Sequence, residues 1–266
     1  MITGKFIAAM DHSGGSTGGV LERYGVEYTE DNKMDLVHEM RLRMVNSPDF
    51  TRDNIWAAIL YKDTIDRGMV PILKNKGIEA ICKIDSGCEE DGTLKDFDVD
   101  AMIQYSVTNG CYGTKMRSIV KTDNIIIPLL KQQFELAKEI ASIGLVPIIE
   151  PEVPIDHPNK ANIESWLLEY LKILLRDFDS HCILKLTLPE VPNLYKELDS
   201  EWVKLVGLSG GYTTKEACRR LAVNDNMTAS FSRALSEGLS ADQYDDLFNG
   251  VLSENINNIV KASEVH

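Results

Sequence analysis

Short apolar runs alternate with amphipathic stretches from one end of the 266-residue chain to the other. An apolar run of about four to eight residues is typical of a buried strand, and apolar residues at helical spacing are typical of a helix that covers it. Strands that alternate with helices predict a parallel sheet. The runs that we interpret as strands are Phe6–Asp11, Ile55–Tyr61, Ile78–Asp85, Gly110–Arg117, Leu145–Glu152, Cys182–Pro189, Val203–Ser209 and Met227–Leu235.

Three of the intervening stretches have a clear helical period. They are Ile126–Ile143, Ile163–Leu175 and Glu254–Ala262. Alternating units that repeat in this way over about 250 residues predict an α/β fold, namely a closed (β/α)8 TIM barrel. An open doubly wound sheet is the alternative. Because no linker rich in proline or serine interrupts the pattern, residues 1–266 are expected to form a single domain.

Composition and charge exclude several classes of function. The formal net charge of −13 argues against a nucleic-acid partner and against binding to an anionic membrane surface. No apolar run approaches the roughly 20 residues that span a bilayer, and the beginning of the sequence lacks a signal-peptide core. The five cysteines are odd in number and scattered, which favours a reducing compartment, so we expect a cytoplasmic protein. The sequence leaves the oligomeric state open, with a homo-oligomer as one alternative.

Polar residues gather where the predicted strands end. In a TIM barrel these carboxyl ends form the rim of the active site, so charged groups of both signs are expected to converge on one mouth. The rim residues are Asp11, Lys83, Asp85, Lys115, Arg117, Glu150, Glu152, Lys185, Ser209, Gly210, Gly211, Ser230, Ser232 and Arg233.

Lys185 lies between two leucines inside an apolar strand. At a sheet edge such a lysine reaches along the apolar surface to solvent, but a closed barrel has no edge. Burial disfavours the ammonium form and therefore favours a nucleophilic amine. The residues alone leave two interpretations open, a nucleophile or a structural ion pair with Glu150 or Asp11.

The carboxylates of the rim also have two interpretations each. Glu150 and Glu152 are two residues apart on one strand, so they face the same way and suit acid/base chemistry. Pairing with barrel lysines is the alternative, and we favour it for Glu152. Asp11 precedes a turn rich in serine and glycine, where an N-cap is the commonplace role.

Two glycine-rich segments are candidates for anion binding. Barrels often bind phosphate after strands seven and eight, where Ser209-Gly210-Gly211 and Arg233 lie. Ser13-Gly14-Gly15-Ser16 is a second candidate and an equally good plain turn. The histidines show no HxH or HxxxH pair, so the sequence predicts no metal site.

Taken together and in order, six segments resemble the class I fructose-bisphosphate aldolases, most closely the bacterial type of Gram-positive cocci. The resemblance covers nearly the whole chain. The segments are Phe6–Ser16, Gly113–Ser118, Gly144–Glu152, Leu184–Thr187, Leu208–Tyr212 and Ala229–Leu235.

The resemblance implies an aldehyde-lyase that reversibly cleaves fructose 1,6-bisphosphate to dihydroxyacetone phosphate and glyceraldehyde 3-phosphate, in glycolysis and gluconeogenesis, without a metal or other cofactor. Lys185 resembles the lysine that forms a Schiff base with the C2 ketone, and Glu150 the acid/base that expels water from the carbinolamine. Asp11 resembles the base that takes the C4 hydroxyl proton, and Lys115 the cation that holds Glu150 and the substrate hydroxyls.

The resemblance also implies two phosphate subsites. Ser209, Gly210, Gly211 and Arg233 match the C1-phosphate site. The far-phosphate side is matched by Lys83, Arg117, Ser13 and Ser16.

The sequence departs from the family pattern after Ser16. It reads Thr17-Gly18-Gly19 where relatives usually carry a proline and a lysine, so one basic contact near the far phosphate is missing. Strict preference for a bisphosphate over a monophosphate therefore does not follow from the sequence. Two alternatives stay open at this point: a Schiff-base lyase of the same fold that acts on another ketose phosphate, and a non-catalytic sugar-phosphate-binding barrel.

Overall fold

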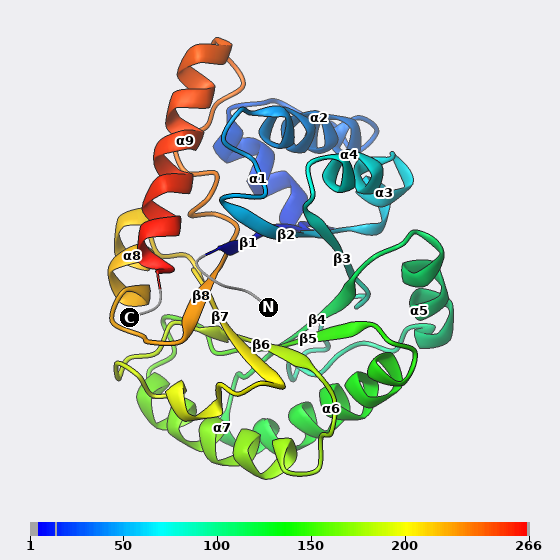
Figure 1. Ribbon diagram of the computed structural model, residues 1–266, viewed down its shortest axis with the longest axis vertical. Coiled ribbons are helices and arrows are strands. Elements are labelled where there is room, and N and C mark those ends of the chain that lie inside the picture. Colours follow the sequence, from blue (N-terminus) through cyan, green and yellow to red (C-terminus); the bar gives the residue numbers. More distant parts are fainter. Residues whose placement is uncertain (1–4, 14, 265–266) are drawn as a thin grey trace.

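The computed structural model describes residues 5–13 and 15–264. Within them, eight parallel strands pair in chain order, and β8 pairs with β1 to close a barrel (Figure 1). The strands are β1 (Phe6–Met10), β2 (Ile55–Leu60), β3 (Glu79–Lys83), β4 (Gly113–Ile119), β5 (Val146–Glu152), β6 (Cys182–Thr187), β7 (Val203–Leu208) and β8 (Met227–Phe231).

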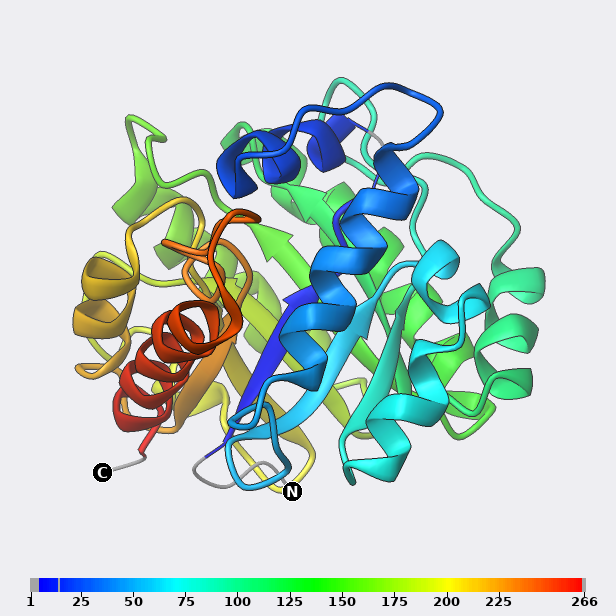
Figure 2. The ribbon, with the colours of Figure 1, turned by 90° about the horizontal axis from the view of Figure 1, so that it is seen from above.

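Helices form an outer layer around this barrel (Figures 1 and 2). The α-helices are α1 (Gly15–Tyr24), α2 (Lys33–Asn46), α3 (Lys62–Asp66), α4 (Met69–Asn75), α5 (Val99–Thr108), α6 (Ile126–Ser142), α7 (Lys160–Leu175), α8 (Thr214–Leu221) and α9 (Asp245–Ala262). Two short 3-10 helices are η1 (Asp123–Ile125) and η2 (Lys196–Leu198). None of the helices in the described residues is long and apolar enough to cross a membrane.

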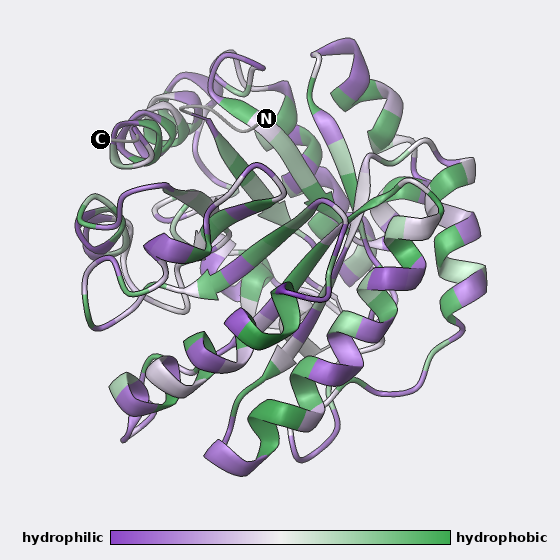
Figure 3. Ribbon diagram, turned by 60° about the horizontal axis from the view of Figure 1, so that its bottom comes forward, coloured by the Kyte–Doolittle hydropathy of each residue, from purple (hydrophilic) through white to green (hydrophobic). Residues whose placement is uncertain are grey.

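Strand periodicity divides the core into two parts. Successive side chains of a strand point to opposite faces, so alternate residues of each barrel strand point inward. The inward residues pack into a small cluster inside the barrel, while the outward residues pack under the helices in a larger cluster. Figure 3 shows the result, with strands that are mostly hydrophobic and helices that carry both hydrophobic and hydrophilic stretches. The inner cluster consists of Ile7, Ala9, Ala57, Ile59, Ile81, Ile148, Ile183 and Val206.

The predicted TIM barrel and all of its predicted strands are confirmed, and only boundaries differ. The eighth run was predicted to continue to Leu235, but β8 ends at Phe231 because the chain turns there, with the Leu235 amide donating to the Ser232 carbonyl at 3.0 Å. The fourth run was predicted from Gly110, which adopts a φ of +67° that a strand does not use, so β4 begins at Gly113. The last helix begins at Asp245, nine residues before the predicted start at Glu254.

Candidate active site

The site is the layer of side chains directly above the inner apolar cluster. Lys185 follows Ile183 by two residues on β6, and Glu150 follows Ile148 by two residues on β5. The same spacing points both charged groups into the barrel, toward its carboxyl end. Lys83 follows Ile81, and Asp11 follows Ala9, in the same way. On these strands, a step of two residues therefore leads from the apolar interior of the barrel to its charged mouth.

Four side chains of this charged layer form one continuous chain of ion pairs, in the order Asp11, Lys115, Glu150 and Lys185. Nζ of Lys115 lies 2.6 Å from Oδ2 of Asp11 and 3.1 Å from Oε2 of Glu150. The other oxygen of that glutamate, Oε1, lies 3.2 Å from Nζ of Lys185. The side chains of Lys115, Glu150 and Lys185 are at most 5% exposed. Lys185 therefore agrees with both interpretations from the sequence. It forms an ion pair with Glu150, and it also lines an open cavity where a nucleophile could meet a substrate.

Charge pairing fixes the protonation of two members of this chain. Burial by itself raises the pKa of Asp11, but the charges of Lys115 and Lys185 outweigh it and hold the pKa far below its usual range. Burial by itself lowers the pKa of Lys115, but Asp11 and Glu150 outweigh it and raise the pKa above its usual value. At neutral pH the pair is therefore a carboxylate and an ammonium ion.

The backbone beneath Glu150 is held by a glutamine from outside the barrel. Gln133 on α6 is fully buried; its Oε1 accepts from the Glu150 amide at 3.0 Å, and its Nε2 donates to the Glu150 carbonyl at 3.3 Å and to Oγ of Ser118 at 2.7 Å. These bonds fix the strand on which the carboxylate is carried. Gln133 was not predicted, because a glutamine in a helix gives no sequence signal for such a contact.

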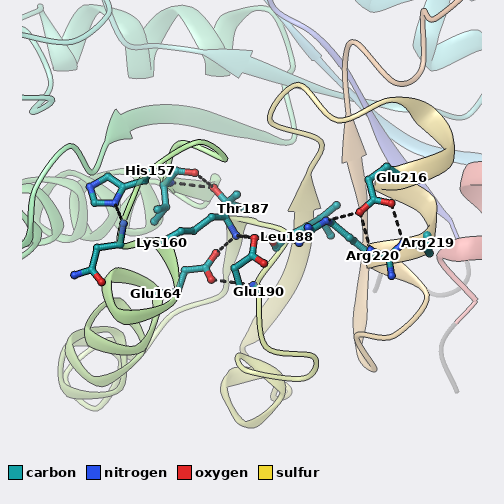
Figure 4. A network of polar contacts seen from close by, with 11 residues as sticks. His157, Lys160, Glu164, Thr187, Leu188, Glu190, Glu216, Arg219 and Arg220 are labelled. Atoms are coloured by element: carbon teal, nitrogen blue, oxygen red, sulfur yellow. Dashed lines mark hydrogen bonds and ion pairs between the residues drawn. The ribbon is translucent and has the colours of Figure 1, made fainter.

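The strand that carries Lys185 is anchored just beyond the lysine. Oγ1 of Thr187 donates to the carbonyl of Val153 at 2.7 Å and accepts from its amide at 2.9 Å, which ties the end of β6 to that of β5. Nζ of the buried Lys160 donates to the Leu188 carbonyl at 2.9 Å and pairs with Oε1 of Glu164 at 2.5 Å (Figure 4). Segments from α7 and from the loop after β5 therefore restrain the backbone on the carboxyl side of the lysine.

A cavity of about 970 Å³ opens over the charged layer. It brings together most of the residues that the sequence predicted for the site. Gly211 does not line the cavity, and Gly14 and the side chain of Ser16 lie outside the described part of the chain. The predicted residues that do line it are Asp11, Ser13, Lys83, Lys115, Arg117, Glu150, Lys185, Ser209, Gly210 and Arg233.

The loop after β7 and the turn after β8 meet at this cavity. Gly210 and Gly211 have φ values of +59° and +115°, so both lie in the region that favours glycine. A Cβ at Gly211 would lie 3.2 Å from Nη1 of Arg233, so the guanidinium group lies directly against the loop backbone. A glycine-rich loop beside a guanidinium group, at the edge of the cavity, suits a phosphate.

On the opposite strands the predicted phosphate contacts are paired with acids. Nζ of Lys83 lies 2.9 Å from Oδ1 of Asp85 and donates to the carbonyl of the same residue at 2.8 Å. Nη1 of Arg117 lies 3.1 Å from Oε2 of Glu152, so among the described residues this glutamate pairs with an arginine and not with a barrel lysine, the partner favoured from the sequence. Each cation is therefore already compensated by a neighbouring carboxylate.

His12 lies beside Asp11 and was not predicted as a site residue. Its Nε2 and Oγ of Ser232 lie 2.8 Å apart in a hydrogen bond, and its carbonyl accepts from Nη2 of the buried Arg41 at 2.6 Å. Burial is the largest cause that lowers the pKa of His12, to about 3; Asp11 opposes this, and Arg41, Arg23 and Arg233 add to it. The imidazole is therefore neutral at physiological pH and connects the end of β1 to the turn after β8.

Within the described residues, no group of three or more His, Cys, Asp and Glu side chains is placed to hold a metal ion. The charged layer nevertheless has what amine chemistry on a ketone requires. It offers a buried lysine, a carboxylate in contact with it and a second carboxylate nearby. This arrangement can form an imine and move protons around it.

Comparisons with known proteins point to one family. A sequence model of "Fructose-bisphosphate aldolase class-I" matches residues 1–168. The "Fructose-bisphosphate aldolase class 1" of Synechocystis sp. is 44% identical over 279 residues, which cover 97% of this chain and 93% of that protein.

Solved structures share the fold. The fructose-bisphosphate aldolase of Plasmodium falciparum superimposes with a TM-score of 0.79 at 21% identity, over 99% of this chain and 91% of that one. An archaeal fructose 1,6-bisphosphate aldolase gives a TM-score of 0.60 at 10% identity, over 95% and 93% of the two chains. At these identities the structures support the barrel, while the sequence relatives carry the assignment.

Proposed function

The chain belongs to the class I fructose-bisphosphate aldolase family, and from that premise we propose that residues 1–266 act as one catalytic domain that cleaves fructose 1,6-bisphosphate through a Schiff base on Lys185. The products are dihydroxyacetone phosphate and glyceraldehyde 3-phosphate, and the reaction is reversible. The observation that carries the mechanism is the contact between Lys185 and Glu150 at 3.2 Å, at the floor of the cavity.

The first half of the reaction makes an electron sink. Neutral Nζ of Lys185 attacks the C2 carbonyl and forms a carbinolamine. Glu150 passes a proton from the attacking amine to the C2 oxygen, which becomes a hydroxyl group. After taking a second proton from solvent in the open cavity, Glu150 gives it to that hydroxyl group, so that water leaves and an iminium ion remains. Lys115 stays protonated throughout, because its two acid partners raise its pKa, and it keeps Glu150 in place.

The second half breaks the carbon–carbon bond. Asp11 accepts the proton of the C4 hydroxyl, the C3–C4 electrons move to the iminium nitrogen, and glyceraldehyde 3-phosphate leaves. The enamine is then protonated at C3, and water hydrolyses the iminium to release dihydroxyacetone phosphate and free Lys185. The low pKa of Asp11 keeps it ionised before the reaction, so it is available as the base. No step in this sequence requires a metal, and metal independence is part of the proposal.

The glycine loop after β7 and Arg233 form the C1-phosphate subsite of this proposal. Ser209, Gly210 and Gly211 supply backbone N–H groups, and the guanidinium group of Arg233 lies against Gly211. The far-phosphate side includes Ser13, Ser16, Lys83 and Arg117, as the family resemblance implies.

Three finer assignments belong to the same proposal. The six matching segments favour the subtype of Gram-positive cocci, and the scattered, odd-numbered cysteines favour a cytoplasmic location. A homo-oligomer is compatible with the exposed Trp166 and Ile173 of α7, and light scattering of the purified protein measures it.

Cleavage of fructose 1,6-bisphosphate in the presence of EDTA tests the function. We expect the wild-type protein to cleave it at the same rate with and without the chelator. Lys185→Arg keeps the positive charge but cannot form the Schiff base, so cleavage should fall by at least about 1000-fold. Lys138→Arg, at an exposed position of α6, is the matched control and should keep the wild-type rate. Full activity of Lys185→Arg, or loss of wild-type activity with EDTA, contradicts the proposal.

A further inference from the structure

The charged groups that line the cavity do not balance. Among the described residues, five of the cations that line the cavity form ion pairs with carboxylates. They are Lys62, Lys83, Lys115, Arg117 and Lys185. The two remaining lining cations, Arg23 and Arg233, have no carboxylate within ion-pair distance among the described residues. An uncompensated guanidinium group is the stronger attractor for a phosphate dianion, because no neighbouring acid repels the ligand.

These two arginines come from different elements. Arg233 lies in the turn after β8, against Gly211, and serves the C1 phosphate in the proposed function. Arg23 lies near the end of α1, which follows β1. In Figure 2 this helix lies across the end of the barrel to which the strand arrowheads point, so its side chains can face the mouth. A molecule with two phosphates therefore meets one uncompensated arginine from each of two elements.

Gly19 lies beside the guanidinium group of Arg23. Gly19 stands one helical turn before Arg23 and lines the same cavity. A Cβ at Gly19 would find Nη1 of Arg23 at 3.5 Å as its single near neighbour among the described residues. A side chain at position 19 would therefore project toward the guanidinium group of Arg23.

Gly18, the residue before Gly19, lies against the side chain of Tyr28. A Cβ at Gly18 would collide with the hydroxyl group of Tyr28, whose Oη also donates to Oε1 of Glu22 at 3.4 Å. A side chain at position 18 is therefore blocked by the tyrosine, whereas one at position 19 would lie in ordinary contact with the arginine.

We propose that Arg23 binds the second phosphate of the substrate and so sets the preference for a bisphosphate over a monophosphate. The inference rests on the proposed function and adds a specificity-determining residue to it. Lys83 and Arg117, which are paired with Asp85 and Glu152, then contribute less to this phosphate than their position suggests.

The test compares two substrates that differ only in the second phosphate. Fructose 1-phosphate keeps the C1 phosphate but lacks the other one, so the ratio of kcat/KM for the two substrates isolates that phosphate. Arg23→Gln should lower kcat/KM for fructose 1,6-bisphosphate by about 10- to 100-fold, as for loss of a charge-assisted contact, and change it for fructose 1-phosphate by less than about 3-fold. Arg23→Lys should retain most of the preference.

Two further variants complete the design. Gly19→Lys in the Arg23→Gln background should restore at least part of the preference, because a side chain at position 19 projects into the vacated space. Arg176→Gln, which removes an exposed arginine at the end of α7 away from the cavity lining, is the control for net charge and should leave both substrates unaffected.

The outcomes separate the inference from the function beneath it. An Arg23→Gln protein that cleaves fructose 1,6-bisphosphate as well as the wild type does, or that loses both substrates equally, overturns the role of Arg23 and leaves the aldolase assignment standing. A wild-type protein that cleaves neither substrate removes the proposed function and this inference together.

Discussion

Oε1 of Glu150 lies 3.2 Å from Nζ of Lys185, while Oε2 of the same carboxylate lies 3.1 Å from Nζ of Lys115. One buried acid therefore serves two lysines of different strands. Lys115 also has Asp11 as a partner, so two carboxylates support its charge, whereas Lys185 shares a single one. Lys185, which has the single carboxylate partner, is the lysine that we propose as the nucleophile.

Replacement of Glu150 by glutamine should impair chemistry more than folding. The amide preserves the shape of the side chain but cannot carry protons between the amine and the C2 oxygen, so we expect kcat to fall by about 100- to 1000-fold. Glu152→Gln is the matched control two residues along β5, where the side chain pairs with Arg117, and should cost less than about 5-fold. Steady-state cleavage rates measure both. Equal effects of the two substitutions contradict the assigned role of Glu150.

Lys115→Met should destabilise the fold strongly. Without this ammonium group, the Asp11 and Glu150 carboxylates remain buried with only Lys185 nearby, so the free energy of unfolding should fall by about 3–5 kcal/mol. Lys196→Met breaks the exposed ion pair with Asp225 and should cost no more than about 1 kcal/mol. Urea unfolding followed by circular dichroism measures the difference. Similar losses for the two variants would show that the ion-pair chain is not a structural element.

His12 should make stability depend on pH below neutrality. Its pKa in the folded state is about 3, below the ordinary value of 6.5, so the unfolded chain binds more protons between these two pH values. The stabilisation is fully present above about pH 6.5 and is lost as the pH falls toward 3, with a slope of up to about 1.4 kcal/mol per pH unit. Asp11, whose pKa is lowered from 3.8, adds its own loss only at more acidic pH.

His12→Gln should remove that slope between pH 6 and 4, since glutamine does not titrate and can still bond to Ser232. Urea unfolding across this range, with wild type and variant compared at pH 8 as the reference, measures the effect. At pH 8 the two proteins should differ by less than about 1 kcal/mol. Parallel stability curves between pH 6 and 4 contradict a neutral, partly buried histidine.

The Lys160–Glu164 pair offers a test of the anchor behind Lys185 (Figure 4). Lys160→Met leaves the fully buried Glu164 without its cation and the Leu188 carbonyl without its donor, so we expect a loss of about 3–5 kcal/mol. A double variant, Lys160→Met with Glu164→Met, removes the stranded charge and should recover a good part of the loss. Thermal unfolding measures both variants. A double variant that is less stable than Lys160→Met contradicts this account.

The barrel, and the position of most candidate site residues at its mouth, could be predicted from the sequence for a physical reason. Strand side chains alternate with a period of two, so an apolar residue such as Ile183 followed by Lys185 already places the lysine one layer above the core. In a closed parallel barrel every such strand end lies at the same mouth. At the strand ends, the alternation of residues in the sequence is therefore enough to place a side chain at the mouth of the barrel.

Partners that are distant in the sequence could not be predicted in this way. The bond between His12 and Ser232 joins residues 220 positions apart, and Gln133 reaches Glu150 from a helix. Arg23 gave no sequence signal, because a charged residue on an exposed helix face is commonplace. Its relation to Gly19 becomes visible only when α1 is placed over the cavity. Which lysine pairs with which acid likewise depends on four strand ends at once, those of β1, β4, β5 and β6.

The most direct test of the central claim is to incubate the protein with dihydroxyacetone phosphate, reduce the mixture with borohydride and locate the adduct by peptide mass spectrometry. The account predicts one reduced adduct on Lys185, with Lys115 and the other lysines unmodified. An adduct on a different lysine, or no adduct at all, would contradict the Schiff-base mechanism proposed for this site.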